Sequence, residues 1–99
     1  MEQIPLGEIV ITHGIEQEMS ETYGFKEFCM HCLIRHRNGD WGDTCREDRE
    51  LNEKAASEGG RLMSVYRLPR RLCIGYAEAI WVITEEDRSF TTILFPYEY

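Results

Sequence analysis

The spacing of apolar residues changes part-way along this chain of 99 residues, and that change most restricts how it can fold. Between residues 15 and 36, apolar side chains recur every third or fourth position, as they do on one face of an α-helix. Gly24 divides this stretch into two predicted helices. From residue 62 onward, β-branched and aromatic residues predict strands over residues 62–68, 79–84 and 90–95.

Shorter signals complete the expected order of elements. Residues 7–12 are rich in β-branched side chains and predict a strand. Thr44 and Glu47 match a capping box, which predicts the start of a third helix that ends at Gly59-Gly60. We therefore expect a single domain over residues 1–99. Its predicted fold class is α+β, with an N-terminal strand and helices packed on a C-terminal three-stranded antiparallel β-meander.

Composition and charge restrict the class of protein. Hydrophobic residues make up 42% of the chain and charged residues 29%, as in an ordinary globular domain. No apolar run approaches the roughly 18 residues that span a bilayer. The first residues lack the basic start and apolar stretch of a secretory signal, so we expect a cytoplasmic protein and no membrane partner. The net charge of -7 argues against direct binding to nucleic acid.

The charges are unevenly distributed along the chain. Residues 1–25 contain no Lys or Arg, and their acidic residues are Glu2, Glu8, Glu16, Glu18 and Glu21. Residues 61–76 contain no acid, and their basic residues are Arg61, Arg67, Arg70 and Arg71. This arginine cluster is where the chain could meet a phosphate. The simpler alternative is that these arginines pair with the acidic N-terminal segment.

Cysteine and histidine residues gather between residues 29 and 45. On a helix, Cys29, Cys32 and His36 share one face, and the glycine-containing turn that follows could return Cys45 to it. Three thiolates and one imidazole would complete the tetrahedral shell of a structural zinc ion. The spacing therefore predicts Zn as a cofactor, bound by these four residues.

Two alternatives to zinc stay open. The cysteines could be small core residues, because free Cys is among the most buried residue types. Cys29 and Cys32 could instead form a redox pair, although such motifs normally lie where a strand meets a helix. Cys73, far along the chain, is expected in the core.

Several segments form one extended pattern. They are Gly39-Asp40-Trp41-Gly42-Asp43, Glu47-Asp48, Asn52-Glu53, Arg61-Leu62-Met63-Ser64-Val65-Tyr66, the run from Trp81 to Leu94, and Pro96-Tyr97-Glu98-Tyr99. The pattern resembles a family of small bacterial proteins labelled plasmid-related, found on plasmids and phages. The resemblance covers roughly residues 6–99 and implies no particular activity. His36 fits it, whereas Cys29, Cys32 and Cys45 fall outside it. Trp41 and Trp81 can anchor a core, and we expect Trp81 to face the helices.

The first functional hypothesis is a binding protein without catalytic residues. Small proteins of mobile elements disarm host defences, and an acidic surface complements a basic nucleic-acid channel. We therefore expect an anti-CRISPR-like inhibitor whose partner is a host protein such as a CRISPR effector nuclease. The residues expected to bind this partner are Glu2, Glu8, Glu16, Glu18, Glu21, Glu85, Glu86 and Asp87.

The second hypothesis is a ribonuclease. Helices followed by an antiparallel sheet resemble the barnase, colicin and RelE-like toxins in outline, which is a fold-level analogy. His36 would then be the general base. The residues expected around the phosphate are Arg61, Ser64, Arg67, Arg88 and Thr91.

Overall fold

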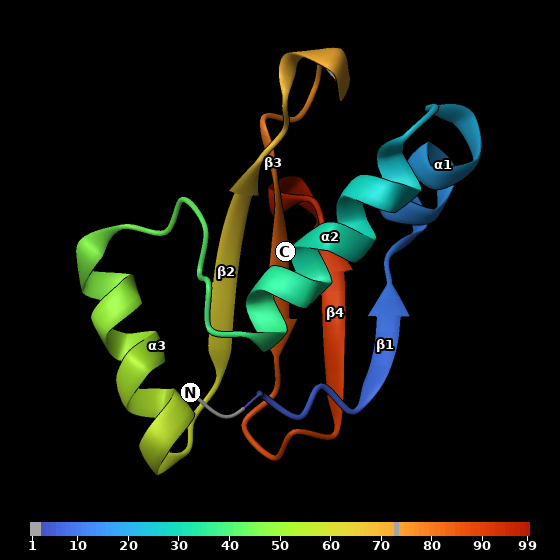
Figure 1. Cartoon of the computed structure of the whole chain (residues 1–99). Helices are drawn as coiled ribbons and strands as arrows, with labels where there is room; N and C mark the ends of the chain where they lie inside the picture. Colours follow the sequence, from blue (N-terminus) through green and yellow to red (C-terminus); the bar gives the residue numbers. More distant parts are fainter. Residues whose placement is uncertain (1–2, 73) are drawn as a thin grey trace.

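The computed structural model describes residues 3–72 and 74–99 of the chain, so the predictions for Glu2 and Cys73 lie outside the described residues. Figure 1 shows a single sheet that one helix crosses, with other helices at its margins. The elements in chain order are β1 (Glu8–Ile11), α1 (His13–Glu21), α2 (Phe25–Arg37), α3 (Arg46–Glu58), β2 (Leu62–Arg67), β3 (Ala79–Thr84) and β4 (Phe90–Leu94), with short 3-10 helices η1 (Arg70–Leu72) and η2 (Pro96–Glu98). Each predicted helix and strand is present within a few residues.

The sheet has four strands in the order β1-β4-β3-β2. Strands β2, β3 and β4 are antiparallel neighbours, and β1 lies parallel to β4. The α+β class is confirmed, but the sheet is mixed and four-stranded rather than a three-stranded meander. The amides of Glu8 and Thr12 donate to the carbonyls of Ser89 and Ile93, which pairs the edge of β4 that a meander would leave open.

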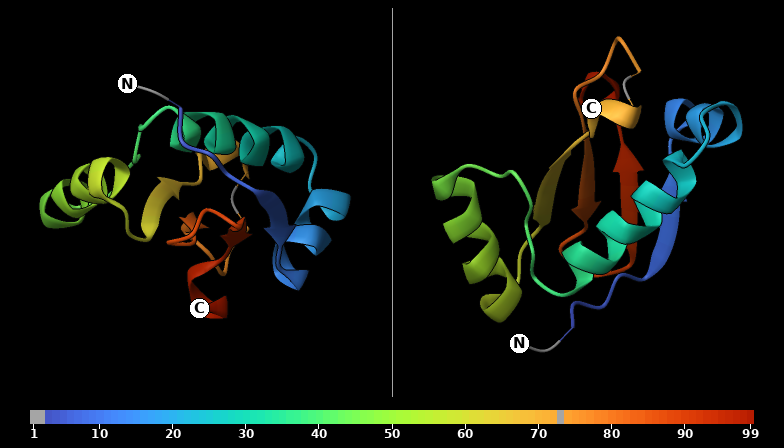
Figure 2. Two further views of the ribbon diagram at one scale, coloured as in Figure 1. Left: turned by 90° about the horizontal axis from the view of Figure 1, so that it is seen from below. Right: turned by 45° about the horizontal axis from the view of Figure 1, so that its top comes forward.

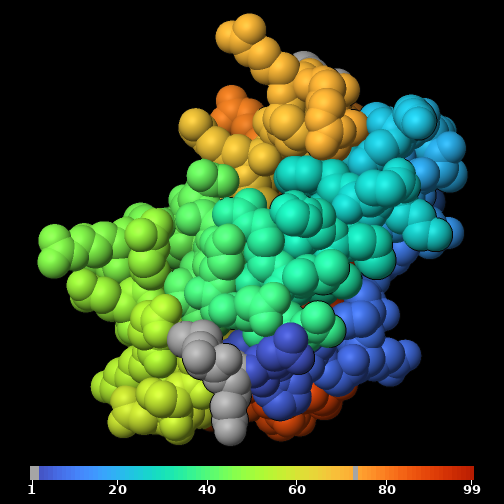
Figure 3. Space-filling view, viewed as in Figure 1, coloured from blue at the N-terminus to red at the C-terminus, as the bar shows by residue number. Residues whose placement is uncertain are grey.

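Helix α2 crosses one face of the sheet, here called the inner face (Figures 1 and 2). Figure 3, viewed onto this side, shows side chains of α2 and α3 spread across it. The residues that pack between α2 and the sheet are Ile15, Phe25, Cys29, Cys32, Leu33, Tyr66, Ile80, Val82, Ile93 and Phe95. The 3.6-residue period of α2 thus places its buried stripe on the sheet. None of the helices in the described ranges is long and apolar enough to span a membrane.

Helix α3 lies beside β2 and closes that edge of the sheet. The Asn52 amide donates to the Met63 carbonyl at 2.7 Å and accepts from the Met63 amide at 3.1 Å, as a neighbouring strand would. Further along β2, the Val65 carbonyl accepts from the Asp43 amide and the Val65 amide donates to the Trp41 carbonyl. Three residues thus pair the outer backbone groups of β2.

The predicted capping box at the start of α3 is wrong. Cys45 is the N-cap residue, and its side chain makes no capping hydrogen bond. The hydroxyl of Thr44 instead donates to the Trp41 carbonyl and closes the preceding turn. A hydroxyl that already closes a turn is not free to cap a helix, although the sequence pattern is the same.

The orientation of β3 is opposite to the one predicted. Ile80, Val82 and Thr84 face α2, so Trp81 and Ile83 lie on the other face of the sheet, here called the outer face. This orientation lets the Thr84 hydroxyl form hydrogen bonds with buried partners on the inner face, as described below. The Trp81 ring is partly exposed and lies against Tyr99, with ring centroids 5.4 Å apart.

Candidate functional site

His36 forms the centre of a fully buried chain of hydrogen bonds. Its Nδ1 lies 2.6 Å from Ser64 Oγ, and its Nε2 lies 2.8 Å from Thr84 Oγ1. The Thr84 hydroxyl lies 2.7 Å from that of Thr91, which donates to the Leu6 carbonyl at 2.7 Å. The His36, Ser64, Thr84 and Thr91 side chains are all inaccessible to solvent.

The contacts and the burial of the ring together assign the protons in the chain. Because Thr91 donates to Leu6, it must accept from Thr84. Thr84 has then used its proton and accepts from His36 Nε2–H. Burial lowers the pKa of His36 to about 4, and the positive charge of Arg88 adds to the shift, which favours the neutral ring. In the neutral ring Nδ1 carries no proton and accepts from Ser64.

The four predicted zinc ligands have different surroundings. Cys29 and Cys32 lie on the buried face of α2, whereas Cys45 is exposed at the start of α3. His36 uses both ring nitrogens on hydroxyl groups. Within residues 3–72 and 74–99, no group of three His, Cys, Asp or Glu side chains is placed to hold a metal ion. As arranged, these residues do not form a tetrahedral site, and zinc binding stays a prediction.

Core packing, one of the alternatives for the cysteines, fits the surroundings of Cys29 and Cys32. Burial raises the pKa of both thiols to about 12, and for Cys29 the neighbouring Cys32 adds to the increase. A thiol that stays protonated at neutral pH is a poor nucleophile, which disfavours the redox alternative. Their side chains contribute to the same apolar cluster as Phe25 and Ile80.

Elemental analysis and thermal melts test the zinc prediction. Zinc bound by Cys29, Cys32, His36 and Cys45 predicts about one equivalent in protein purified without added metal, and a chelator should then lower the melting temperature. Cys45→Ser should lose that zinc. Well under one equivalent, with an unchanged melting temperature in chelator, would contradict the zinc prediction.

The residues proposed for a ribonuclease do not surround one accessible phosphate position. Ser64 and Thr91 are buried in the chain of hydrogen bonds around His36. Arg88 donates to the carbonyls of Gly60 and Ala55, which ties the β3–β4 turn to the end of α3. The buried, neutral ring of His36 has no solvent path for proton transfer to a substrate.

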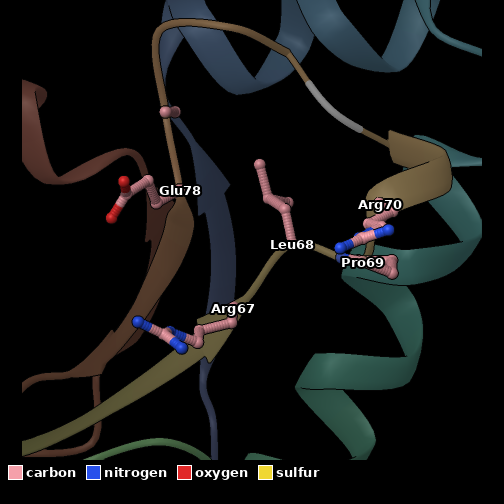
Figure 4. A pocket seen from close by; sticks show the side chains of 6 residues that line it. Arg67, Leu68, Pro69, Arg70 and Glu78 are labelled. Atoms are coloured by element: carbon pink, nitrogen blue, oxygen red, sulfur yellow. The ribbon is translucent and has the colours of Figure 1, made fainter.

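The arginine cluster is divided between the two ends of β2. Arg61 precedes the strand and pairs with Glu85 at 3.6 Å, so its predicted partner in the N-terminal segment is wrong. Arg67 is the last residue of β2 and Arg70 begins η1, and both line a hollow of about 370 Å³ (Figure 4). Glu78 lines the same hollow, so its negative charge opposes an anion there.

The acidic residues proposed to bind a partner have unequal positions. Glu8, Glu16, Glu21, Glu86 and Asp87 are exposed, as a binding role requires. Glu85 is partly buried and paired with Arg61. Glu18 is buried: its carboxylate accepts from the hydroxyls of Thr22 and Tyr76, so its predicted surface role is wrong. The partner Tyr76 lies 58 positions away, which no local pattern reveals.

Sequence reasoning missed the aromatic surface, defined here as Tyr76, Trp81, Tyr97 and Tyr99. Tyr97 is 62% exposed and Tyr99 is 67% exposed. The Tyr76 and Tyr97 ring centroids are 5.8 Å apart, and Tyr99 packs against Trp81 as described above. The C-terminal segment carries two of these rings, and it lies on the side of the sheet away from α2 (Figure 2). The available signal was the alternation of tyrosines in the final Pro96-Tyr97-Glu98-Tyr99, beyond the last strand.

Glu98 fixes the segment that carries Tyr97 and Tyr99. Its carboxylate accepts from the Thr12 hydroxyl at 2.6 Å and from the amides of Gly14 and Phe95 at 2.9 Å each. These bonds tie the C-terminal segment to the start of α1, so the exposed rings stand on a rigid support. Arg61 donates to the Tyr99 hydroxyl at 2.8 Å and links the aromatic surface to the acidic turn at Glu85.

No family model, no curated protein and no solved structure matches this chain. Several residues of the extended sequence pattern described above make contacts that hold the fold together. Asn52 and Gly42 hold the edge of β2, Arg88 joins α3 to a turn, and Trp41 donates from its indole nitrogen to Glu53 at 2.8 Å. These contacts are structural. The exposed rings of the same pattern, together with Tyr76, form the aromatic surface and are the candidate functional surface.

Proposed function

We propose that this chain is a non-enzymatic binding domain that engages a partner protein through its aromatic surface. The observation that carries the proposal is the pair of highly exposed tyrosines, Tyr97 and Tyr99, in one segment that Glu98 holds rigidly. Tyr99 lies beside Trp81 and Arg61. Trp, Tyr and Arg are the residue types that dominate binding energy at protein interfaces. Rigid aromatic side chains also lose little entropy when a partner covers them.

The charges beside this surface indicate the kind of partner. Glu85 meets Arg61 at its border, and the exposed Glu86 and Asp87 follow in the same turn. Together with the net charge of -7, these groups favour a basic partner surface and a salt-sensitive association rate. A nucleic-acid enzyme of a host defence system has such a surface. The resemblance to mobile-element proteins supports the same role, an anti-CRISPR-like inhibitor.

The test is capture of a partner from a host that expresses its defence nucleases. The double variant Tyr97→Ser/Tyr99→Ser should capture at least tenfold less partner protein, because both rings lie in the proposed contact. Tyr23→Ser is the matched control, since Tyr23 is 91% exposed and lies outside the aromatic surface. Equal capture by the double variant, or equal loss in the control, would contradict the proposal.

A further inference from the structure

The two edges of the sheet differ in their protection. The outer backbone groups of β2 are paired by Asn52, Asp43 and Trp41. Strand β1 forms the other edge, and none of the described strands pairs with its outer side. Figure 1 shows β1 at the margin of the sheet, with α1 beyond its end rather than alongside it. Strand β1 contains no Lys, Pro or bulge, the usual devices that block an edge.

The backbone groups that β1 offers can be assigned by residue. The amides of Glu8 and Thr12 point to β4, because they donate to Ser89 and Ile93. Backbone groups alternate in direction along a strand, so the amides and carbonyls of Ile9 and Ile11 point away from the sheet. The side chains of Ile9 and Val10 are 41% and 39% exposed, so both faces of this edge offer apolar surface.

The charge around this edge selects one kind of occupant. The acids Glu8, Glu16 and Glu21 are all exposed, and residues 3–25 contain no Lys or Arg. A second copy of this chain would bring the same negative charges to the same edge. A strand rich in Lys or Arg would instead gain attraction along with its hydrogen bonds.

We propose that β1 binds an extended basic segment of the partner protein, which adds to the sheet as a fifth strand. The Ile9 and Ile11 backbone groups supply the hydrogen bonds, and the exposed side chains of Ile9 and Val10 contact alternate side chains of the added strand. The inference rests on the proposed function for the nature of the partner, a protein. It assigns that partner a second contact, separate from the aromatic surface.

The probe is a synthetic peptide of about nine residues that alternates Lys with Val, acetylated and amidated at its ends. Its control has the same sequence with alternate backbone nitrogens methylated, so charge is kept and hydrogen bonding is lost. We expect the control to bind at least tenfold more weakly. In hydrogen exchange by NMR, the peptide should slow exchange at the Ile9 and Ile11 amides, whereas the Val10 amide is already bonded in the free protein. Equal binding of both peptides, or protection elsewhere, would overturn the proposal.

Two variants separate this edge from the aromatic surface. Ile9→Pro removes an outward amide without touching the bonds to β4, and it should abolish peptide binding, whereas Ile9→Val should retain it. Tyr97→Ser/Tyr99→Ser should leave peptide binding unchanged. Peptide binding lost only in the tyrosine variant would contradict the proposed site at β1 without contradicting the proposed role of the aromatic surface. A dimer of the free protein that Ile9→Pro converts to a monomer would show that a second copy occupies β1, which also overturns the proposal.

Discussion

Gly42→Ala should destabilise the domain by about 3 kcal/mol or more, in equilibrium unfolding by urea. Gly42 has φ of +70°, which only glycine adopts without strain. An added Cβ would also overlap the Val65 carbonyl oxygen and lie 2.6 Å from Tyr66 Cδ1. Backbone on one side and a buried ring on the other leave it no room to move.

Gly59→Ala is the matched control for this prediction. Gly59 has φ of +95°, but a Cβ built there meets no atom within 4 Å. The two variants share the backbone penalty, so the difference between them measures the close approach of the turn to β2. Equal losses in the two variants would mean that the turn can move away from β2, and the structural account of the Gly39–Asp43 pattern would be wrong.

Acidification should destabilise the domain through His36. The pKa of His36 is about 4 in the folded state, compared with 6.5 for an unperturbed histidine. Between pH 6.5 and pH 4 the unfolded chain therefore binds a proton at His36 that the folded chain does not bind. The stability that the lowered pKa contributes to the folded state is complete above pH 6.5 and is lost as pH falls toward 4. The expected loss is about 2 kcal/mol between about pH 7 and about pH 5, and about 3 kcal/mol once both states are protonated.

Urea unfolding at several pH values measures this loss, and NMR titration of the ring gives the pKa directly. His31→Gln removes an exposed histidine and is the matched control. A His36 ring that titrates near pH 6.5 would show that it reaches solvent, and would return it to the list of candidate bases.

The sequence predicts the elements well because their signals are local. The helical period over residues 15–36 and the break at Gly24 depend on near neighbours, and they agree with α1 and α2. The parallel pairing of β1 with β4 depends on contacts more than 80 residues apart in the chain, which no local pattern encodes. The inward side of β3 was mispredicted for the same reason, because Thr84 is drawn inward by His36, 48 positions earlier.

The candidate site was less predictable than the fold. Cys29, Cys32 and His36 do share one buried face of α2, as their spacing predicts. The spacing does not reveal that Ser64 and Thr84 would bond both nitrogens of His36. The aromatic surface likewise needs Trp81 from β3 beside Tyr99 from the chain end. A site assembled from distant segments is visible only after folding.

The measurement that tests the central claim most directly is hydroxyl-radical footprinting of the protein with its captured partner, because it reports the solvent access of individual Trp and Tyr rings. We predict that partner binding lowers the oxidation rates of Trp81, Tyr97 and Tyr99 by about fivefold or more, as in a buried interface core. Tyr23 is the internal reference and should be oxidised equally in the free and bound protein. Unchanged oxidation of Tyr97 and Tyr99 in a stable complex would contradict the account and place the binding site elsewhere on the domain.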